Sequence, residues 1–264
     1  MTDRETMLMT RESRRHSVCC CDGAGFFCVD VLTHHPLFGK AIPCVCRRDS
    51  VAKDRAQRLR KRSGMSAAAL ERWSFISFDP IQCAVRPGGD RTLAIQALAD
   101  AKEVCETFAQ KLEGWLVLIG DVGTGKTHLA HAIGATALHQ DVAVYAATAP
   151  DMLDMLRASY ADGAFDQVFA NLRDVGLLII DDMGTQKGSE WTVEKLFQII
   201  DHRYRSQLPM VVTSNFPLSK AEGRIDRRIL SRLQDGAEVE GGWVRVLALP
   251  VADFRRRRRS RAAA

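Results

Sequence analysis

The chain has 264 residues, of which 46% are hydrophobic and 26% are charged, and its formal net charge is +5. No apolar run approaches the roughly 20 residues of a membrane-spanning helix, and residues 1–17 are charged and lack the hydrophobic core of a secretory signal. We therefore expect a cytoplasmic globular protein without membrane contact, large enough for one main core and a small accessory module.

Positive charge is concentrated in two segments. Residues 47–63 hold eight Lys or Arg side chains against two acids, and residues 255–261 hold six arginines and no acid. The rest of the chain is slightly acidic, so affinity for a polyanion is expected in these two segments. Runs of like charge are also commonly just solvated, which leaves both nucleic-acid contact and a solvated surface open.

Six of the eight cysteines precede residue 47. Thiols stay reduced in the cytosol, so such a cluster indicates metal rather than disulfides, with unliganded thiols as the alternative. Two cysteine groups about two dozen residues apart, with glycines nearby, predict a tetrahedral Zn²⁺ site. Its expected ligands are Cys19, Cys21, Cys44 and Cys46. Because the first group lacks C-x-x-C spacing, the alternatives to Cys19 are Cys20, Cys28, His16, His34 and His35.

The next segments are a helix, a linker and a second helix. The charged stretch 49–62 favours a helix that ends at Ser63-Gly64. Aromatic residues in 73–80 and a turn over 86–90 indicate a linker that docks onto the following domain, which opens with an amphipathic helix over 92–112. The predicted organisation is a zinc-binding module with a basic helix over 1–63, a linker over 64–91, and a nucleotide-binding domain with an Arg-rich tail over 92–264.

An apolar strand then runs into the pattern G-x-x-x-x-G-K-T. Glycines let successive backbone N–H groups point at phosphates, Lys126 reaches the β- and γ-phosphates, and the Thr127 hydroxyl ligates Mg²⁺. A helix beginning near Thr127 adds its positive end, whereas the alternative is an ordinary Gly-rich turn. The predicted nucleotide-binding residues are Gly120, Asp121, Val122, Gly123, Thr124, Gly125, Lys126 and Thr127.

Strands and helices alternate through the rest of the domain. The patterns predict strands at 143–146, 175–180 and 210–213, and helices at 150–159, 166–173 and 194–204. This alternation predicts an α/β fold with a largely parallel sheet, and it places ligands at the carboxyl ends of the strands.

Two acids end the 175–180 strand. A carboxylate at the end of a buried strand needs a partner, and Mg²⁺ on the nucleotide would be that partner for Asp181. Asp182 could orient or deprotonate the attacking water, although acids also form turns. Asn215 closes a third strand and offers an amide to the γ-phosphate or its water, but Ser-Asn also starts turns.

Three arginines, Arg227, Arg228 and Arg232, lie in the segment 226–233, and the last two share a helix face. A guanidinium there could reach the γ-phosphate of a neighbouring subunit. A surface salt bridge is the alternative.

Taken together, these motifs resemble the AAA+ ATPases, and more closely their DnaC/IstB-like branch. The residues that carry the resemblance are Gly120–Thr127, Leu177–Gly184, Ser189-Glu-Trp191, Leu196–Tyr204, Thr213-Ser-Asn215 and Arg228–Arg232. The N-terminal cysteines, Gly-x-Gly, His-Pro-x-Phe-Gly-Lys and Cys-x-Cys-Arg are similar to the zinc-bearing front end of some helicase-loader-like proteins. The resemblance covers residues 19–256.

The resemblance implies a P-loop AAA+ core with a parallel sheet flanked by helices and a reduced or absent lid. It also implies the cofactors ATP, Mg²⁺ and Zn²⁺, with Lys126, Thr127 and Asp181 contacting phosphate and Mg²⁺. The implied catalytic residues are Asp182 for the water, Asn215 as sensor, Arg232 as trans-acting finger and Arg255 as second sensor.

The implied function is that of an ATP-dependent helicase loader. Such a protein self-associates in its ATP state on single-stranded DNA and holds a replicative helicase through its N-terminal module. The alternative is an IstB-like transposition helper that remodels duplex DNA and recruits a transposase. A third possibility is an adaptor with negligible turnover, since Asp182 is one methylene shorter than the glutamate of many AAA+ proteins.

Overall fold

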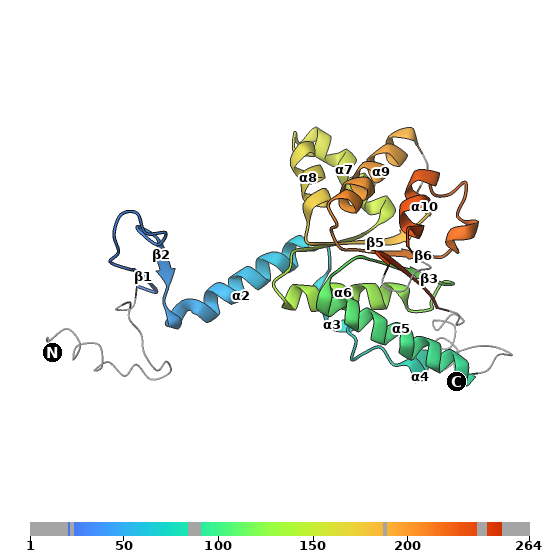
Figure 1. The fold of residues 1–264 in the computed structure, drawn as a ribbon, viewed down its shortest axis with the longest axis horizontal. Helices are drawn as coiled ribbons and strands as arrows, with labels where there is room; N and C mark the ends of the chain where they lie inside the picture. Colours follow the sequence, from blue (N-terminus) through green and yellow to red (C-terminus); the bar gives the residue numbers. More distant parts are fainter. Residues whose placement is uncertain (1–20, 22–23, 84–90, 187–188, 237–241, 250–264) are drawn as a thin grey trace. The chain divides into compact units, whose positions relative to one another are not determined.

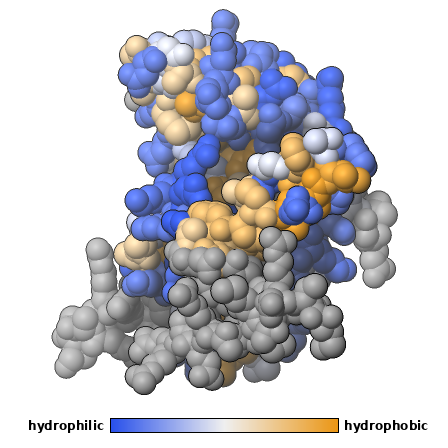
Figure 2. Space-filling model, turned by 90° about the vertical axis from the view of Figure 1, so that its left-hand side faces the viewer, coloured by the Kyte–Doolittle hydropathy of each residue, from blue (hydrophilic) through white to orange (hydrophobic). Residues whose placement is uncertain are grey.

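The computed structural model describes residues 21, 24–83, 91–186, 189–236 and 242–249 (Figure 1). The chain divides into two compact units, Met1–Arg58 and Leu59–Ala264. Within the described ranges, no helix is long and apolar enough to cross a membrane. The face drawn in Figure 2 is mostly polar, with apolar residues gathered in smaller patches.

The first unit contains a short antiparallel ribbon of β1 (Phe26–Cys28) and β2 (Ala41–Pro43). Cys21 and Cys44 are both buried in it. The Gly25 backbone N–H donates to Cys21 Sγ at 3.1 Å, and its carbonyl accepts from the Cys44 N–H at 3.0 Å. Gly25 takes a φ of +79°, a conformation that favours glycine. It therefore links the two cysteine-bearing segments.

The basic helix α2 (Val45–Arg62) crosses from the first unit into the second. It begins four residues before the predicted start at 49 and ends at the predicted residue. Basic side chains in its last turn suit the negative end of the helix dipole. Ser63 ends it, with a hydroxyl that donates to the Arg60 carbonyl at 2.7 Å.

The second unit is an α/β domain around a five-stranded sheet in the order β4-β5-β6-β3-β7. All four neighbouring pairs are parallel, which confirms the parallel sheet predicted from the alternating pattern. The strands are β3 (Trp115–Ile119), β4 (Val144–Thr148), β5 (Leu177–Met183), β6 (Met210–Ser214) and β7 (Val244–Ala248). The interior strand β3 is buried at every residue, as expected for a strand covered on both faces.

Helices cover both faces of this sheet (Figure 1). One core packs α7 (Ala149–Ala161), α8 (Phe165–Asp174), α9 (Glu190–Arg205) and α10 (Arg227–Gln234) on one face. The other core packs α5 (Arg91–Lys111) and α6 (Lys126–His139) on the opposite face. A 3₁₀ turn, η1 (Leu218–Lys220), precedes α10. The predicted helices are confirmed, with ends shifted by a few residues.

The segment predicted as a linker carries two short helices, α3 (Ala67–Arg72) and α4 (Pro80–Cys83). Met65 and Phe78 from this segment are buried in the core beside α5 and α6. The Ala146 N–H donates to the Ser63 carbonyl at 2.8 Å, so the start of the segment also pairs with the edge strand β4. Residues 63–83 are therefore part of the second unit rather than a free connection.

Candidate nucleotide-binding site

The phosphate loop, Gly120–Thr127, joins β3, which lies between β6 and β7 in the sheet, to α6. Gly125 is the N-cap of α6 and has a φ of +99°. A Cβ at Gly125 would lie 2.7 Å from Phe78 Cε2, so this position requires glycine for two reasons, its backbone conformation and its packing. The loop therefore presents main chain rather than side chains at the start of α6, where backbone N–H groups favour anions.

Lys126 lies inside the loop and is 4% exposed. Its Nζ donates to the carbonyls of Gly120 and Asp121, each at 2.8 Å. The Thr124 hydroxyl also donates to the Asp121 carbonyl, at 2.9 Å. The position of this buried ammonium within the loop suits contact with anionic phosphates.

One hydrogen-bonded group joins Thr127, Asp181 and Thr213. Thr127 lies at the start of α6, and the other two lie near the carboxyl ends of β5 and β6. The Thr127 hydroxyl lies 3.1 and 3.0 Å from the two carboxylate oxygens of Asp181. The Thr213 hydroxyl donates to Asp181 Oδ1 at 2.5 Å and accepts from the Asp182 N–H at 2.9 Å. Sequence reasoning assigned no role to Thr213. Its position at the end of β6, before the noted Ser-Asn pair, is the signal that could have found it.

Asp182 is turned away from Asp181 by an irregularity in β5. The β5–β6 register shifts between Ile180 and Met183, and Asp182 has a φ of +53°. A non-glycine residue in this region is uncommon and costs about 1–3 kcal/mol. As a result its Oδ1 accepts from Asn215 Nδ2 at 3.1 Å. The structure thus brings together the two residues predicted to act on the water, and it places Asp182 within the strand rather than beyond it.

The donor set at this site fits Mg²⁺ and a nucleoside triphosphate. Mg²⁺ prefers oxygen ligands and is bound by one or two protein groups together with phosphates. The Thr127 hydroxyl and the Asp181 carboxylate would supply those oxygens, and Lys126 would supply positive charge to the phosphates.

Two histidines on α6 attach the segment 73–78 to the helix of the phosphate loop. His128 Nε2 lies 2.9 Å from the Ser74 carbonyl oxygen, and its ring contacts Phe78 edge-on. His131 Nδ1 lies 2.8 Å from the Thr127 carbonyl, and its ring centroid is 4.5 Å from that of Trp73. Burial lowers the pKa of both histidines, although these carbonyl contacts act in the opposite direction. Burial therefore favours the neutral form of both rings.

Arg232 is held by α9 of its own subunit. Its Nε donates to Asp201 Oδ1 at 2.7 Å, Nη2 pairs with the same oxygen, and Nη1 donates to the Arg228 carbonyl at 3.1 Å. Arg228 in turn pairs with Asp226 at 3.0 Å and Glu194 at 3.5 Å. No described contact joins Arg232 to its own phosphate loop. The salt-bridge alternative therefore holds within the subunit, and a role in trans stays a prediction.

The predicted zinc ligands are only partly described. Cys21 and Cys44 are buried, Cys19 lies outside the described residues, and for Cys46 only the backbone, in α2, is described. Cys28 and His35, two of the alternatives, are exposed. In the described part of the chain, no group of three or more His, Cys, Asp or Glu side chains could hold a metal. The zinc site stays a prediction, and Arg255 also lies outside the described residues.

An aromatic surface on α7, α8 and α9 was not found from the sequence. It consists of Tyr160, Phe165, Phe169 and Trp191. Tyr160 stacks on Phe165 with ring centroids 4.1 Å apart, Phe165 stacks on Phe169 at 5.5 Å, and Trp191 lies 6.2 Å from Tyr160. Tyr160 is 52% exposed. Phe165, Phe169 and Trp191 are partly buried against the core, so the surface exposes the Tyr160 ring most and the other three rings in part.

Cations surround the aromatic surface. Arg157 lies over the Trp191 ring at 5.0 Å, and Arg173 over Phe169 at 5.7 Å. Lys195 lies 5.4 and 5.2 Å from the rings of Phe165 and Phe169. The segment Ser189-Glu-Trp191 was noted as a motif in the sequence, but the contact of Trp191 with Tyr160 and Arg157 depends on the tertiary fold.

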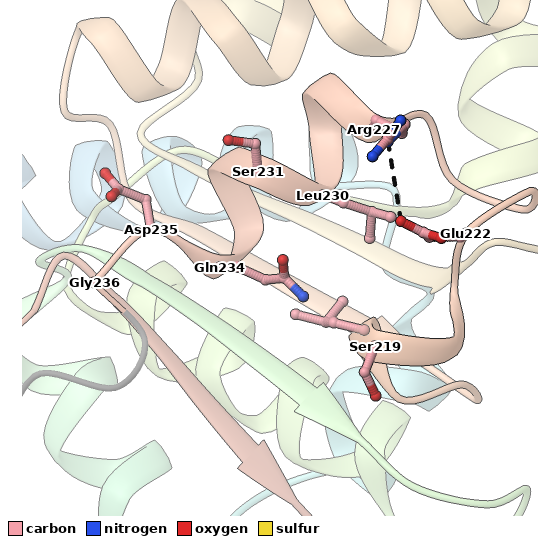
Figure 3. Close-up of a pocket in the computed structure, with 9 residues that line it drawn as sticks. Ser219, Glu222, Arg227, Leu230, Ser231, Gln234, Asp235 and Gly236 are labelled. Carbon is pink, nitrogen blue, oxygen red and sulfur yellow. Dashed lines mark ion pairs between the residues drawn. The ribbon is translucent and has the colours of Figure 1, made fainter.

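A pocket of about 680 Å³ lies between η1 and α10 (Figure 3). Arg227 points toward Glu222 in it, with Nε and a carboxylate oxygen 4.0 Å apart. Its lining is Leu218, Ser219, Glu222, Arg227, Leu230, Ser231, Gln234, Asp235 and Gly236. None of the predicted nucleotide-binding residues is among them, so this pocket is separate from the phosphate loop.

A family model described as IstB-like ATP binding protein matches residues 51–233. The replicative helicase loader DnaC of Escherichia coli (strain K12) is 27% identical over 152 residues, which cover 57% of this chain and 60% of DnaC. The Insertion sequence IS5376 putative ATP-binding protein of Geobacillus stearothermophilus is 35% identical over 100 residues, which cover 38% and 39% of the two chains. The chain spans less than two thirds of the length of the curated relatives it matches.

A solved structure, the crystal structure of the DnaC helicase loader, superposes with a TM-score of 0.54 at 19% identity. The match covers 69% of this chain and 99% of that chain. Identity this low shows the fold alone, and that fold is the AAA+ core. The family model covers more than half of the chain and includes the phosphate loop, β5 and β6. The chain therefore belongs to the IstB-like ATP-binding family of AAA+ proteins, which is related to the DnaC helicase loaders.

Proposed function

We propose that this protein is an ATP-hydrolysing helicase loader that assembles on single-stranded DNA and delivers a replicative helicase. The observation that carries the proposal is the combination, in one domain, of a candidate nucleotide site with a partly exposed aromatic surface bordered by cations. The first supplies an energy source and a switch. The second has the chemistry that recognises unpaired bases.

The nucleotide site supports hydrolysis by water. Backbone N–H groups of the phosphate loop and Lys126 hold the phosphates, and Thr127 and Asp181 hold the Mg²⁺ that neutralises their charge. Asp182, oriented by Asn215, takes a proton from the attacking water. The water oxygen then bonds to the γ-phosphorus while the bond to the β–γ bridging oxygen breaks, which yields ADP and phosphate. Asp182 is fixed by its bond to Asn215 and by the Thr213 contact to its N–H.

The aromatic surface supports binding to single strands in preference to duplex. In a duplex the base faces are stacked on one another, so only unpaired bases can stack on Tyr160 and Trp191. Arg157, Lys195 and Arg173 lie within reach of phosphates that flank such bases. Because each of these cations also contacts a ring, the same side chains would orient both parts of a nucleotide.

The first unit supports the contact with a helicase. Leu32 and Phe38 are 71% and 52% exposed there, although both are large apolar side chains. Contiguous exposed apolar patches, unlike single residues, mark contact sites for other proteins, so the proposal requires that these side chains form part of one patch. We propose that Zn²⁺ bound by Cys19, Cys21, Cys44 and Cys46 stabilises this module, which is too small to be stabilised by apolar burial alone.

A transposition helper is the second candidate. The observation that favours it is the likeness to the insertion-sequence protein, which is 35% identical over its matched segment. This candidate shares the nucleotide chemistry but differs in the nucleic acid, since it would act on duplex DNA and recruit a transposase. The two candidates are therefore distinguished by the DNA that drives assembly.

The test is the size-resolved mass of the protein with a slowly hydrolysed ATP analogue and either a single strand or a duplex of the same length. The loader proposal predicts assembly that needs both nucleotide and single strand. Assembly on duplex alone would favour the transposition helper. A monomer under every condition would contradict both candidates.

A further inference from the structure

We infer that Asp201 is a positioning residue for the trans-acting arginine, Arg232. This inference rests on the proposed function, because it concerns the arginine that would reach the γ-phosphate of a neighbouring subunit. Asp201 lies on α9, between the acids of β5 and the Asn215 strand in sequence, and it was not among the predicted site residues.

The Asp201 carboxylate holds one edge of the Arg232 guanidinium. Nε and Nη2 both reach Asp201 Oδ1, while Oδ2 accepts from Arg205 Nη2 at 2.9 Å. The Asp201 side chain is 13% exposed and that of Arg232 is 24% exposed, so solvent screens this pair less than a surface pair. The carboxylate engages Nε and Nη2 and the Arg228 carbonyl engages Nη1, so each terminal nitrogen keeps one further N–H that can face a phosphate.

Aromatic rings hold the plane of the same guanidinium. Arg232 Cζ lies 4.9 Å from the Phe197 ring centroid and 5.8 Å from that of Tyr204. The Arg228 carbonyl accepts from Nη1 and restricts rotation about the guanidinium axis. These four partners fix a side chain that would otherwise lose much rotational freedom on contacting a neighbour. Asp201 is the charged one among them, so its removal should affect both position and orientation.

This preorganisation of the Arg232 guanidinium should affect the rate of hydrolysis at the neighbouring subunit. A guanidinium that is placed before the neighbour binds ATP contributes its charge without first being ordered. A misplacement of about 1 Å can lower a rate roughly 100-fold. Asp201 should therefore act on hydrolysis at the neighbouring subunit's site, and not on nucleotide binding by its own subunit.

Mixing two variants isolates that effect. Arg232→Ala subunits keep an intact nucleotide site but supply no arginine. Asp182→Asn subunits supply Arg232 but do not activate water. Neither is expected to hydrolyse ATP alone, whereas a mixture on single-stranded DNA should recover part of the wild-type rate at interfaces where an Asp182→Asn subunit supplies the arginine. No recovery would overturn the trans mechanism itself, and with it this inference.

The decisive test uses donor subunits, which supply Arg232 to the Arg232→Ala subunits and carry a second substitution besides Asp182→Asn. An Asp182→Asn, Asp201→Asn donor should restore roughly 10- to 100-fold less activity than the Asp182→Asn donor, while it binds the ATP analogue equally well. An Asp182→Asn, Arg205→Ala donor is the matched control, since it removes the other described partner of Asp201 but leaves Arg232 in place, and it should restore as much activity as the Asp182→Asn donor.

Four results would overturn the positioning role even when the trans mechanism holds. Equal recovery with the Asp201→Asn donor would mean that the carboxylate is dispensable. Greater recovery would mean that Asp201 withholds the arginine instead of presenting it. Equal losses with the Asp201→Asn and Arg205→Ala donors, or weakened analogue binding by the Asp201→Asn donor, would mean that Asp201 serves only the stability of α9.

Discussion

The Thr127 hydroxyl lies 3.0 Å from Asp181 Oδ2 and 3.1 Å from Oδ1, so the start of α6 and the end of β5 meet through one hydrogen-bonded pair. The two residues are 54 positions apart in sequence. Both supply oxygen ligands suited to Mg²⁺, and Thr213 holds the carboxylate from a third element. The proposed mechanism therefore makes hydrolysis depend on the Thr127 hydroxyl.

Replacing Thr127 with valine should remove that hydroxyl at nearly constant volume. Loss of one metal contact of several kcal/mol predicts a fall of roughly 100-fold or more in Mg²⁺-dependent hydrolysis. Nucleotide binding without Mg²⁺ should persist, because the loop backbone and Lys126 remain. Thr136→Val on the same helix is the control, since its hydroxyl bonds only within α6 to the Ala132 carbonyl. Equal rates for Thr127→Val and wild type would exclude Thr127 as a metal ligand.

Trp191→Ala should weaken binding to single-stranded DNA. Loss of one base–aromatic stack is worth about 1–3 kcal/mol, which raises Kd roughly 5- to 150-fold. Fluorescence anisotropy with a labelled oligonucleotide would measure the change. Phe38→Ala serves as the comparison, because it removes an exposed aromatic ring of the first unit and should leave this affinity unaltered. Wild-type affinity in the Trp191→Ala protein would show that the aromatic surface is not the binding site for single strands.

Arg203→Ala should be strongly destabilising although Arg203 lies in a charged stretch of α9. The side chain is fully buried, and it donates to the carbonyls of Arg173 at 2.9 Å, Val175 at 2.8 Å and Pro209 at 2.6 Å. Burial lowers its pKa to about 10, so it remains charged at neutral pH. Leaving these acceptors unsatisfied predicts a loss of about 3 kcal/mol or more in the free energy of unfolding.

Arg205→Ala provides the matched comparison for Arg203. Arg205 lies on the same helix, its side chain is 74% exposed, and its ion pair with Asp201 is expected to contribute only about 0–1 kcal/mol. Urea denaturation of both variants would compare the two losses directly. Similar small losses would contradict the structural role of the buried guanidinium.

Acid should loosen the attachment of residues 73–78 to α6. Burial lowers the pKa of His128 and His131 in the folded protein below the usual value of 6.5. A histidine with a lowered folded pKa contributes its full stability above the unfolded pKa and loses it as pH falls through the folded pKa. The Tm should therefore drop between pH 7 and pH 5, and this drop should be smaller in a His128→Gln, His131→Gln protein. An equal drop in both proteins would assign the acid sensitivity to other groups.

The nucleotide site followed from sequence because its signals are local. The spacing of Gly120, Gly125 and Lys126 after an apolar strand was enough to predict the phosphate loop. The apolar run 175–180 was enough to predict that Asp181 lies at the same edge of the sheet as this loop. The parallel strand order brought these residues together, since carboxyl ends of parallel strands meet at one edge. Short elements without a clear period, such as α3 and β7, were not predicted.

Other features depend on contacts that a single segment does not show. Tyr160, Phe165 and Trp191 come from three helices, and only packing on the sheet gathers them. Arg203 and Arg205 look alike in sequence, yet one is buried and the other is exposed. The positive φ of Asp182 arises from the register shift against β6, which no local propensity reports.

The most direct measurement is the steady-state rate of ATP hydrolysis without DNA, with single-stranded DNA and with duplex DNA, for wild type, Asp182→Asn and Trp191→Ala. The account predicts a rate stimulated by single strands more than by duplex, lost in Asp182→Asn by roughly 100-fold or more, and poorly stimulated in Trp191→Ala. A rate that single strands do not stimulate, or that survives in Asp182→Asn, would contradict the proposed loader.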